Sequence, residues 1–327
     1  MKNTLLGLSL LLCSTSLAAA EELHLFNWGD YTSPELLSKF EAETGIRVTT
    51  TDYDSNDTAL AKISAGGTGF DLVVPSAHFV QIYVEKGLVQ KLDLTRLPHH
   101  GNIKPEWVDV EWDKGREYSI PWQWGSTGIS VDTSVYSGDA NTSDIFLNPP
   151  DALKGKINVV PEMNEIVNLA VMWAGGKPCS EDVAVLKKAR DALMNAKQYW
   201  LSMDYGTTER MANGEWAASV NWSGETFRAR LANPNVVYGY PKEGYPLWMD
   251  SVMLLSDAQN VDAAYKFLDF IMLPENAALI SAFARYPNGI TGAEDFMPAD
   301  MQTAPEVVIP EASRAAGHFL PTCAGKS

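Results

Sequence analysis

The sequence has few of the residues on which metal centres and covalent catalysis depend. Its 327 residues include five histidines and three cysteines. It contains no His-Glu-x-x-His or Gly-x-Ser-x-Gly motif, and the glycine-rich stretch 66–69 is too short and lacks the lysine of a phosphate-binding loop. These absences argue against a metalloprotease, an esterase and an ATPase. We therefore expect no cofactor, no metal and no enzymatic activity.

Basic residues and long apolar runs are also scarce. Lysine and arginine total 25 against 41 aspartates and glutamates, which gives a formal net charge of −16. Nucleic acids and anionic membranes require basic patches, so neither is an expected partner. After the leader, no stretch approaches the roughly 18–20 apolar residues of a membrane span. The acidity fits attraction of cations, but it fits the solubility of a secreted protein equally well.

The N-terminus has the pattern of a secretory signal peptide. Lys2 is followed by the apolar stretch Leu5–Leu12 and by the small residues Ala18–Ala20. We predict that residues 1–20 are removed and that the mature protein begins at Glu21 in the periplasm. The alternative of a lipid-anchored protein, through Cys13, is disfavoured because Cys13 follows leucines and not a small residue.

Two cysteines, Cys179 and Cys323, remain after removal of the leader. The periplasm permits disulfides, so the pair could form one bridge. Spacing alone does not distinguish that bridge from two unpaired cysteines.

Helix and strand patterns alternate along the first hundred residues. Ser33 and Pro34 are typical of a helix start and Gly45 of a helix end. Later segments continue the pattern, and the whole indicates an α/β fold with a parallel sheet. The expected strands are 23–27, 46–52, 71–74, 129–131, 157–160 and 217–222, and the expected helices, besides the one that Ser33 starts, are 56–64, 184–193 and 261–272.

The mature chain is too long for one compact core, so we expect two lobes. The predicted first lobe is discontinuous and combines residues 21–128 with about 250–305. The second comprises 129–249, possibly with the C-terminal segment 306–327. No low-complexity linker separates them, so strands would join the lobes and act as a hinge.

Aromatic residues stand beside acidic or hydroxyl residues at several predicted strand ends. An aromatic face attracts an ammonium group, and a carboxylate supplies the counter-charge and accepts its hydrogen bonds. The combination predicts a site for an organic amine. The stretches are Asn27–Tyr31, Pro75–Ser76, Asn221–Gly224 and Trp248–Asp250.

A resemblance to a known family is carried by residues 26–31, 43–48, 68–76, 121–128, 240–244 and 248–251. In these stretches the chain resembles the bacterial periplasmic spermidine- and putrescine-binding (polyamine-binding) proteins of ABC transporters. The resemblance runs from about Leu23 to about Asn288. It implies a two-lobe type II periplasmic binding protein fold that closes on its ligand, acts as a monomer and delivers the ligand to a membrane permease.

The resemblance also implies roles for individual residues. Asp250 would take a primary ammonium, Ser76 would hydrogen-bond near it, and Glu162 and Glu165 fall where the family places the acids that meet the other amine. Of these two glutamates we expect one, with Glu165 preferred, in the cleft and the other on a solvated face. Asp30 would either contact the ligand or cap the following helix. The rings would line the cleft, with Trp28 and Tyr31 on one wall, Trp222 and Trp248 on the other, and Tyr286 in addition.

Two positions depart from the family pattern. Gly29 stands where relatives often carry a hydroxyl residue, which would open space near one amine. His78 stands where spermidine binders tend to have an aromatic residue. A neutral imidazole there would accept an amine proton and a charged one would repel it, so affinity would depend on pH.

The leading function is that of a transport receptor that delivers polyamines to an ABC importer, and the alternative is a receptor that docks on a membrane signalling protein and reports polyamines. They use the same cleft, so the sequence does not separate them. It also leaves open which polyamine is bound.

Overall fold

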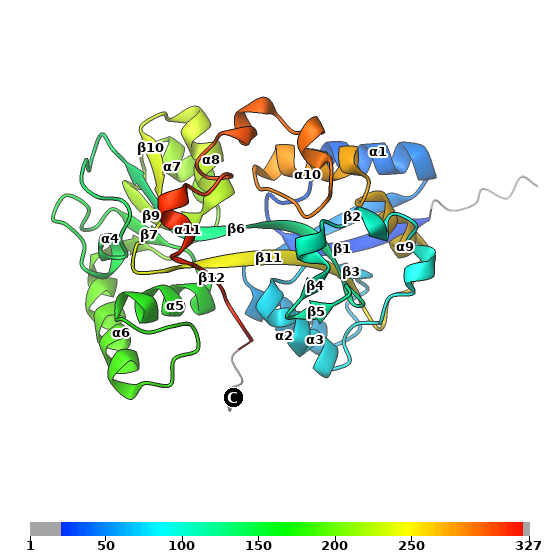
Figure 1. The fold of residues 1–327 in the computed structure, drawn as a ribbon, viewed down its shortest axis with the longest axis horizontal. Helices are drawn as coiled ribbons and strands as arrows, with labels where there is room; N and C mark the ends of the chain where they lie inside the picture. The colour runs from blue at the N-terminus through cyan, green and yellow to red at the C-terminus, as the bar shows by residue number, and fades with distance from the viewer. Residues whose placement is uncertain (1–20, 323–327) are drawn as a thin grey trace, which may run out of the picture.

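The computed structural model describes residues 21–322, which fold into two lobes lying side by side (Figure 1). The predicted signal peptide, Cys13 and Cys323 lie outside the described residues. Within the described range no single helix is long and apolar enough to cross a membrane, although the bent pair 261–270 and 274–284 passes that test jointly.

The strands differ greatly in length, and two of them are much longer than the rest. The strands are β1 (Glu22–Trp28), β2 (Arg47–Tyr53), β3 (Leu72–Val73), β4 (Asp109–Val110), β5 (Asp113–Lys114), β6 (Ser119–Asp132), β7 (Ile157–Val159), β8 (Trp200–Ser202), β9 (Ala218–Trp222), β10 (Val236–Gly239), β11 (Tyr245–Leu254) and β12 (Gly317–Phe319).

The helices pack around these strands. They are α1 (Pro34–Thr44), α2 (Asn56–Ser64), α3 (Ala77–Glu85), α4 (Asp144–Leu147), α5 (Met163–Trp173), α6 (Val183–Ala196), α7 (Thr207–Ala212), α8 (Ser223–Ala232), α9 (Val261–Phe270), α10 (Pro274–Ala284) and α11 (Glu311–Arg314). Short 3₁₀ helices cover 94–96, 100–102, 105–107, 197–199, 293–296 and 299–302.

One curled sheet runs through both lobes in the order β2-β1-β3-β11-β6-β9-β7-β8. We call the part that contains β1, β2 and β3 the first lobe and the part that contains β7, β8 and β9 the second lobe. β6 pairs with β11 over its first half and with β9 and β10 over its second half. The long strands β6 and β11 therefore join the lobes, and the predicted boundaries 128/129 and 249/250 fall within them.

The ends of α1 follow from local chemistry. The Ser33 side chain accepts a hydrogen bond from the backbone N–H of Leu36, Pro34 occupies the first turn, and Gly45 adopts the left-handed conformation with φ of 74°. The predicted helix is thereby confirmed, and α2 has the predicted bounds. Because Ser33 is the cap, the suggested capping role of Asp30 is wrong.

The connecting strand is longer than predicted. We expected it at 129–131, whereas β6 begins at Ser119 and 13 of its 14 residues are buried. Pro121 and Gly125 concealed it, because both residues are unfavourable inside strands. Gly125 is needed here because an added Cβ would lie 2.6 Å from the Trp248 ring.

The C-terminal segment crosses between the lobes. β12 pairs in parallel with the start of β11, and the Thr322 hydroxyl then donates to the carbonyl oxygen of His78 in the first lobe at 2.9 Å. The sulfur of Cys179, in the second lobe, lies 3.9 Å from the carbonyl oxygen of Pro321. The described end of the chain is thus held against both lobes.

Candidate functional site

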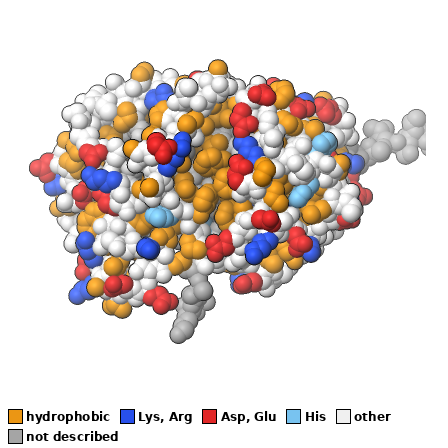
Figure 2. Space-filling model, viewed as in Figure 1, with side chains coloured by type: hydrophobic (Ala, Val, Ile, Leu, Met, Phe, Trp, Pro, Cys, Tyr) orange, Lys and Arg blue, Asp and Glu red, His pale blue; other side chains and the backbone are white. Residues whose placement is uncertain are grey.

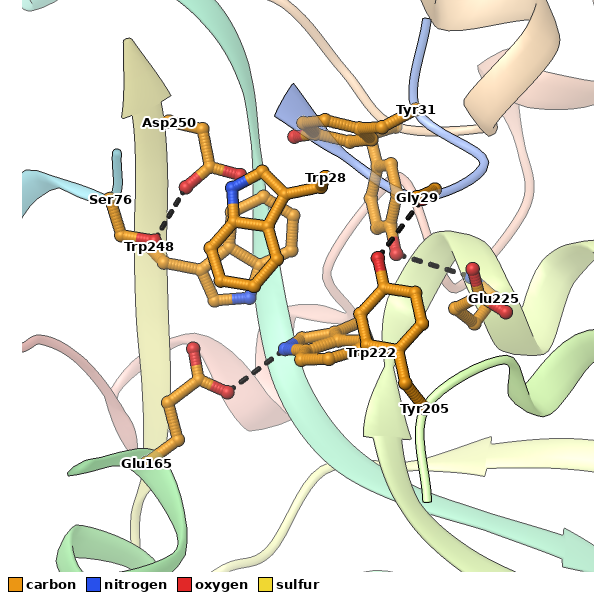
Figure 3. Close-up of a pocket in the computed structure, with 11 residues that line it drawn as sticks. Trp28, Gly29, Tyr31, Ser76, Glu165, Tyr205, Trp222, Glu225, Trp248 and Asp250 are labelled. Carbon is orange, nitrogen blue, oxygen red and sulfur yellow. Dashed lines mark hydrogen bonds between the residues drawn. The ribbon is translucent and has the colours of Figure 1, made fainter. Parts of the chain in front are cut away.

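A cavity lies between the lobes, beside the crossing strands. On one face of the molecule, hydrophobic side chains gather along the boundary between the lobes, and charged side chains lie on both sides of this band (Figure 2). Both lobes and β11 contribute to the cavity lining (Figure 3). The lining residues are Trp28, Gly29, Tyr31, Ser76, Glu165, Tyr205, Trp222, Glu225, Trp248, Asp250 and Tyr286.

Asp250 is held on β11, where the pairing with β6 shifts register between Asp250 and Ser251. Its Oδ1 accepts a hydrogen bond of 2.7 Å from the Ser76 hydroxyl, and Ser76 is positioned in turn by Asn56. Burial raises the pKa of Asp250 to about 7, against the lowering effect of the Ser76 hydrogen bond. A carboxylate held this way is costly without a cation, because burial disfavours the charged form.

Glu165 faces the cavity from the second lobe. It lies in the first turn of α5, and its Oε2 accepts hydrogen bonds from Thr127 at 2.6 Å and from Nε1 of Trp222 at 2.9 Å. Figure 3 shows the other carboxylate oxygen pointing toward the middle of the cavity. Burial raises the pKa of Glu165.

Glu162 precedes α5 and does not line the cavity. Its Oε2 accepts a hydrogen bond from the backbone N–H of Asn56 in the first lobe at 3.2 Å. Burial, followed by the charge of Glu165, raises its pKa. Because both glutamates are buried, the expectation that one of them lies on a solvated face is wrong.

The aromatic rings surround the space between these acids. Trp28 and Trp222 approach each other across the lobes with ring centroids 6.2 Å apart. Trp248 packs edge-on against Tyr286 at 5.1 Å, and Tyr286 contacts Tyr31 at 5.7 Å. Trp248 therefore packs with Tyr286, and both Trp222 and Trp248 line the cavity.

Two residues that line the cavity, Tyr205 and Glu225, were not predicted from the sequence. The Tyr205 hydroxyl donates to the carbonyl oxygen of Gly29 at 3.0 Å, and a Cβ on Gly29 would lie 3.2 Å from the Tyr205 ring. The space that Gly29 leaves is thus filled by Tyr205 and is not open to an amine. Tyr205 lies in a loop, where no periodic pattern of apolar residues indicates its position. Glu225 lies three residues after Trp222, and the sequence could have indicated it as an acid in the first turn of a helix that follows a strand.

Two predicted site residues lie elsewhere. Asp30 is exposed, with φ of 52°, and its side chain does not line the cavity. His78 is buried in a second cavity, with Trp112 and Pro321 among its neighbours, and burial lowers its pKa to about 4. Its imidazole therefore stays neutral between pH 5.5 and 8, and the predicted role of His78 in pH-dependent binding loses its geometric basis.

The charge balance of the cavity indicates the kind of ligand it suits. Of its three carboxylates, only Glu225 forms an ion pair with a basic residue in the described part of the chain, and that residue is Arg228. Asp250 and Glu165 are buried among rings without such a partner. An organic cation would supply the missing charge. Residues 21–322 contain no group of three or more histidine, cysteine or acidic residues suited to a metal ion.

The protein has two lobes, two long strands that cross between the lobes, and a cavity at the boundary of the lobes. This arrangement is that of a solute-binding protein. The sequence matches the bacterial extracellular solute-binding proteins over residues 35–309, and the chain belongs to that family. The putrescine-binding periplasmic protein SpuD of Pseudomonas aeruginosa is 31% identical over 93% of this chain and 89% of its own length. The putrescine-binding periplasmic protein PotF of Escherichia coli is 31% identical over 94% and 89%.

Solved structures agree with this assignment. The fold is similar to that of a putative spermidine/putrescine ABC transporter protein from Listeria monocytogenes, with a TM-score of 0.86 and 30% identity over 94% of each chain. The predicted two-lobe binding-protein fold is thereby confirmed.

Proposed function

We propose that the protein captures polyamines of the putrescine and spermidine class and delivers them to an ABC importer. The observation that carries this proposal is the pair of buried carboxylates, Asp250 and Glu165, that face one aromatic cavity without a basic partner among residues 21–322. The names of the relatives that match over most of the chain support the same ligand class.

In this proposal the ligand bridges the two carboxylates. One ammonium binds Asp250 beside Ser76, the methylene chain lies among the rings, and the other ammonium binds Glu165. Each buried charge then has a partner, and the apolar chain is shielded from water. Asp250 is on the crossing strand β11, and Glu165 is in the second lobe. The ligand contacts both carboxylates only when the lobes are closed, so its binding favours the closed arrangement over the open one.

The remaining parts of the proposal concern location and partners. The protein acts in the periplasm as a monomer, performs no chemistry on its ligand and docks on a membrane permease. Import is proposed over sensing because a structural neighbour at 30% identity carries the name of an ABC transporter. No feature of the cavity favours the sensing alternative.

Titration calorimetry of the mature protein tests the proposal. The panel comprises putrescine, cadaverine, agmatine, spermidine, a basic amino acid and a sugar. We expect one-to-one binding to polyamines and none to the sugar. Absence of heat with every amine would contradict the proposal.

A further inference from the structure

Glu225 lines the cavity, but both of its carboxylate oxygens already accept hydrogen bonds from donors of the protein. It lies in the first turn of α8, and its side chain is buried. One oxygen, Oε1, pairs with Nη2 of Arg228. The other, Oε2, accepts hydrogen bonds from the Thr207 hydroxyl at 3.0 Å and from both the backbone N–H and the hydroxyl of Thr208.

Arg228 extends from the second lobe to the first. Its Nη1 donates to the carbonyl oxygen of Ala284 at 2.9 Å and, over a longer 3.5 Å, to that of Asp30. Ala284 ends α10, which packs against α1 in the first lobe. Near this contact the backbone N–H of Glu225 donates to the Tyr286 hydroxyl at 3.3 Å. A positive charge built into the protein therefore bridges the lobes at this edge of the cavity.

The other two cavity carboxylates differ from Glu225. Asp250 accepts from Ser76 on Oδ1, and Glu165 receives both of its protein hydrogen bonds on Oε2. Neither has an arginine or lysine partner in the part of the chain that the structure describes. Two cavity carboxylates, those of Asp250 and Glu165, are thus available to a ligand, while the charge of the third, Glu225, is balanced by Arg228.

We propose that Arg228 takes the place of a third ligand amine, so that the site selects polyamines with two amino groups over those with three. This inference rests on the proposed function. A third ammonium near Glu225 would have to compete with a guanidinium that is already paired, and it would be repelled by it. Arg228 is thus a residue that determines specificity, and its contacts to the first lobe also support closure.

The test compares putrescine and spermidine by titration calorimetry in the wild type and in Arg228→Met. Methionine keeps much of the length of the side chain and removes its charge. We expect the wild type to bind putrescine at least tenfold more tightly than spermidine. In Arg228→Met, with Glu225 exposed to the ligand, the ratio of spermidine to putrescine affinity should rise at least tenfold.

A double variant, Arg228→Met with Glu225→Gln, removes both charges and should reverse most of that rise. The matched control is Arg210→Met on the neighbouring α7, because Arg210 pairs with Asp204 and Glu215 outside the cavity. Its affinity ratio should equal that of the wild type. Circular dichroism and thermal unfolding verify that each variant is folded, and Arg228→Gln replaces Arg228→Met if the latter is not.

The outcomes separate the two proposals. Binding of neither amine by the wild type would contradict the proposed function. Putrescine binding with an unchanged ratio in the folded Arg228 variant would overturn the role of Arg228 and leave the proposed function intact. Equal affinity of the wild type for putrescine and spermidine would also overturn that role, even without a folded variant.

Discussion

Asp250 contributes a buried carboxyl group, and in our proposal the bound ligand supplies the partner of its ionised form. Replacing it by asparagine keeps the shape and removes the charge. We predict that Asp250→Asn weakens putrescine binding by about 2–4 kcal/mol, because one buried partner of a charge pair is lost. Titration calorimetry measures the change.

Asp30→Asn is the matched control for this substitution. Asp30 is exposed, it lies outside the cavity lining, and its positive φ of 52° is one that asparagine tolerates. Its affinity for putrescine should stay close to that of the wild type, because its side chain does not line the cavity. Equal affinities of Asp250→Asn and the wild type would contradict the assigned role of Asp250.

The cavity acids also predict how pH affects the ligand-free protein. Burial raises the pKa of Asp250 to about 7, above the 3.8 of an unperturbed carboxyl, and raises those of Glu162 and Glu165 in the same direction. At pH values between the ordinary pKa of these carboxyl groups in the unfolded chain and their raised pKa in the folded protein, the folded state binds more protons than the unfolded state. The contribution of these groups to the free energy of unfolding therefore falls as pH rises from about 4 to about 7.

The ligand reverses this trend, because an ammonium requires ionised carboxylates. We predict that putrescine binds roughly tenfold more tightly at pH 8 than at pH 6 for each acid that must lose its proton. Thermal unfolding at pH 5.5 and pH 8, with and without putrescine, should show a larger ligand-induced rise in Tm at pH 8. A rise of equal size at both values would contradict the carboxylate pKa shifts.

At the scale of single residues, the sequence predicted which side chains line the cavity where a ring and an acid stand close together. Trp248 and Asp250 are two apart on an extended segment, so their side chains were expected on one side, and both line the cavity. His78 also lies near Ser76 in the sequence, but the start of α3 turns it into another cavity. Tyr205 depends on a contact with Gly29, 176 residues away, which no local pattern encodes.

At the level of elements, the C-terminal segment links the two lobes. Cys179 is disulfide-bonded, and its sulfur approaches Pro321, two residues before Cys323. We predict that its partner is Cys323. Closing such a long loop stabilises a fold by about 2–5 kcal/mol.

Peptide mapping without reductant should therefore recover one peptide pair joined through Cys179 and Cys323. Guanidinium unfolding of Cys179→Ser should show a lower free energy of unfolding than the wild type. Free thiols at both cysteines in the exported protein would contradict the bridge.

The sequence predicted correctly those helices and strands whose ends carry typical capping or turn residues. Ser33, Pro34 and Gly45 bound α1 as expected, and the strand that leads to Trp222 ends where it was placed. The pattern failed for β6, whose buried residues do not alternate and include Pro121 and Gly125. Burial on both faces removes the alternation that reveals a strand.

The whole molecule is described in an arrangement with direct contacts between the lobes. Tyr205 reaches Gly29, Glu162 reaches Asn56, and Arg228 reaches Ala284. The ligand would add Asp250 and Glu165 to these bridges, so we predict that putrescine shifts the population further toward closure. Small-angle scattering should then give a smaller radius of gyration with putrescine than without it.

The Asp250→Asn variant is the control for this measurement, since it lacks one end of the ligand bridge. Its radius of gyration should not change at a putrescine concentration that saturates the wild type. A wild-type protein whose radius is the same with and without bound putrescine would contradict ligand-driven closure.

A crystal structure of the mature protein with putrescine tests the proposed binding mode most directly. We predict one terminal nitrogen within about 2.7–3.2 Å of a carboxylate oxygen of Asp250 and the other at a similar distance from Glu165, with the methylene chain among the rings. Putrescine bound away from Asp250, or with both nitrogens on one lobe, would contradict a site in which the ligand bridges the two carboxylates.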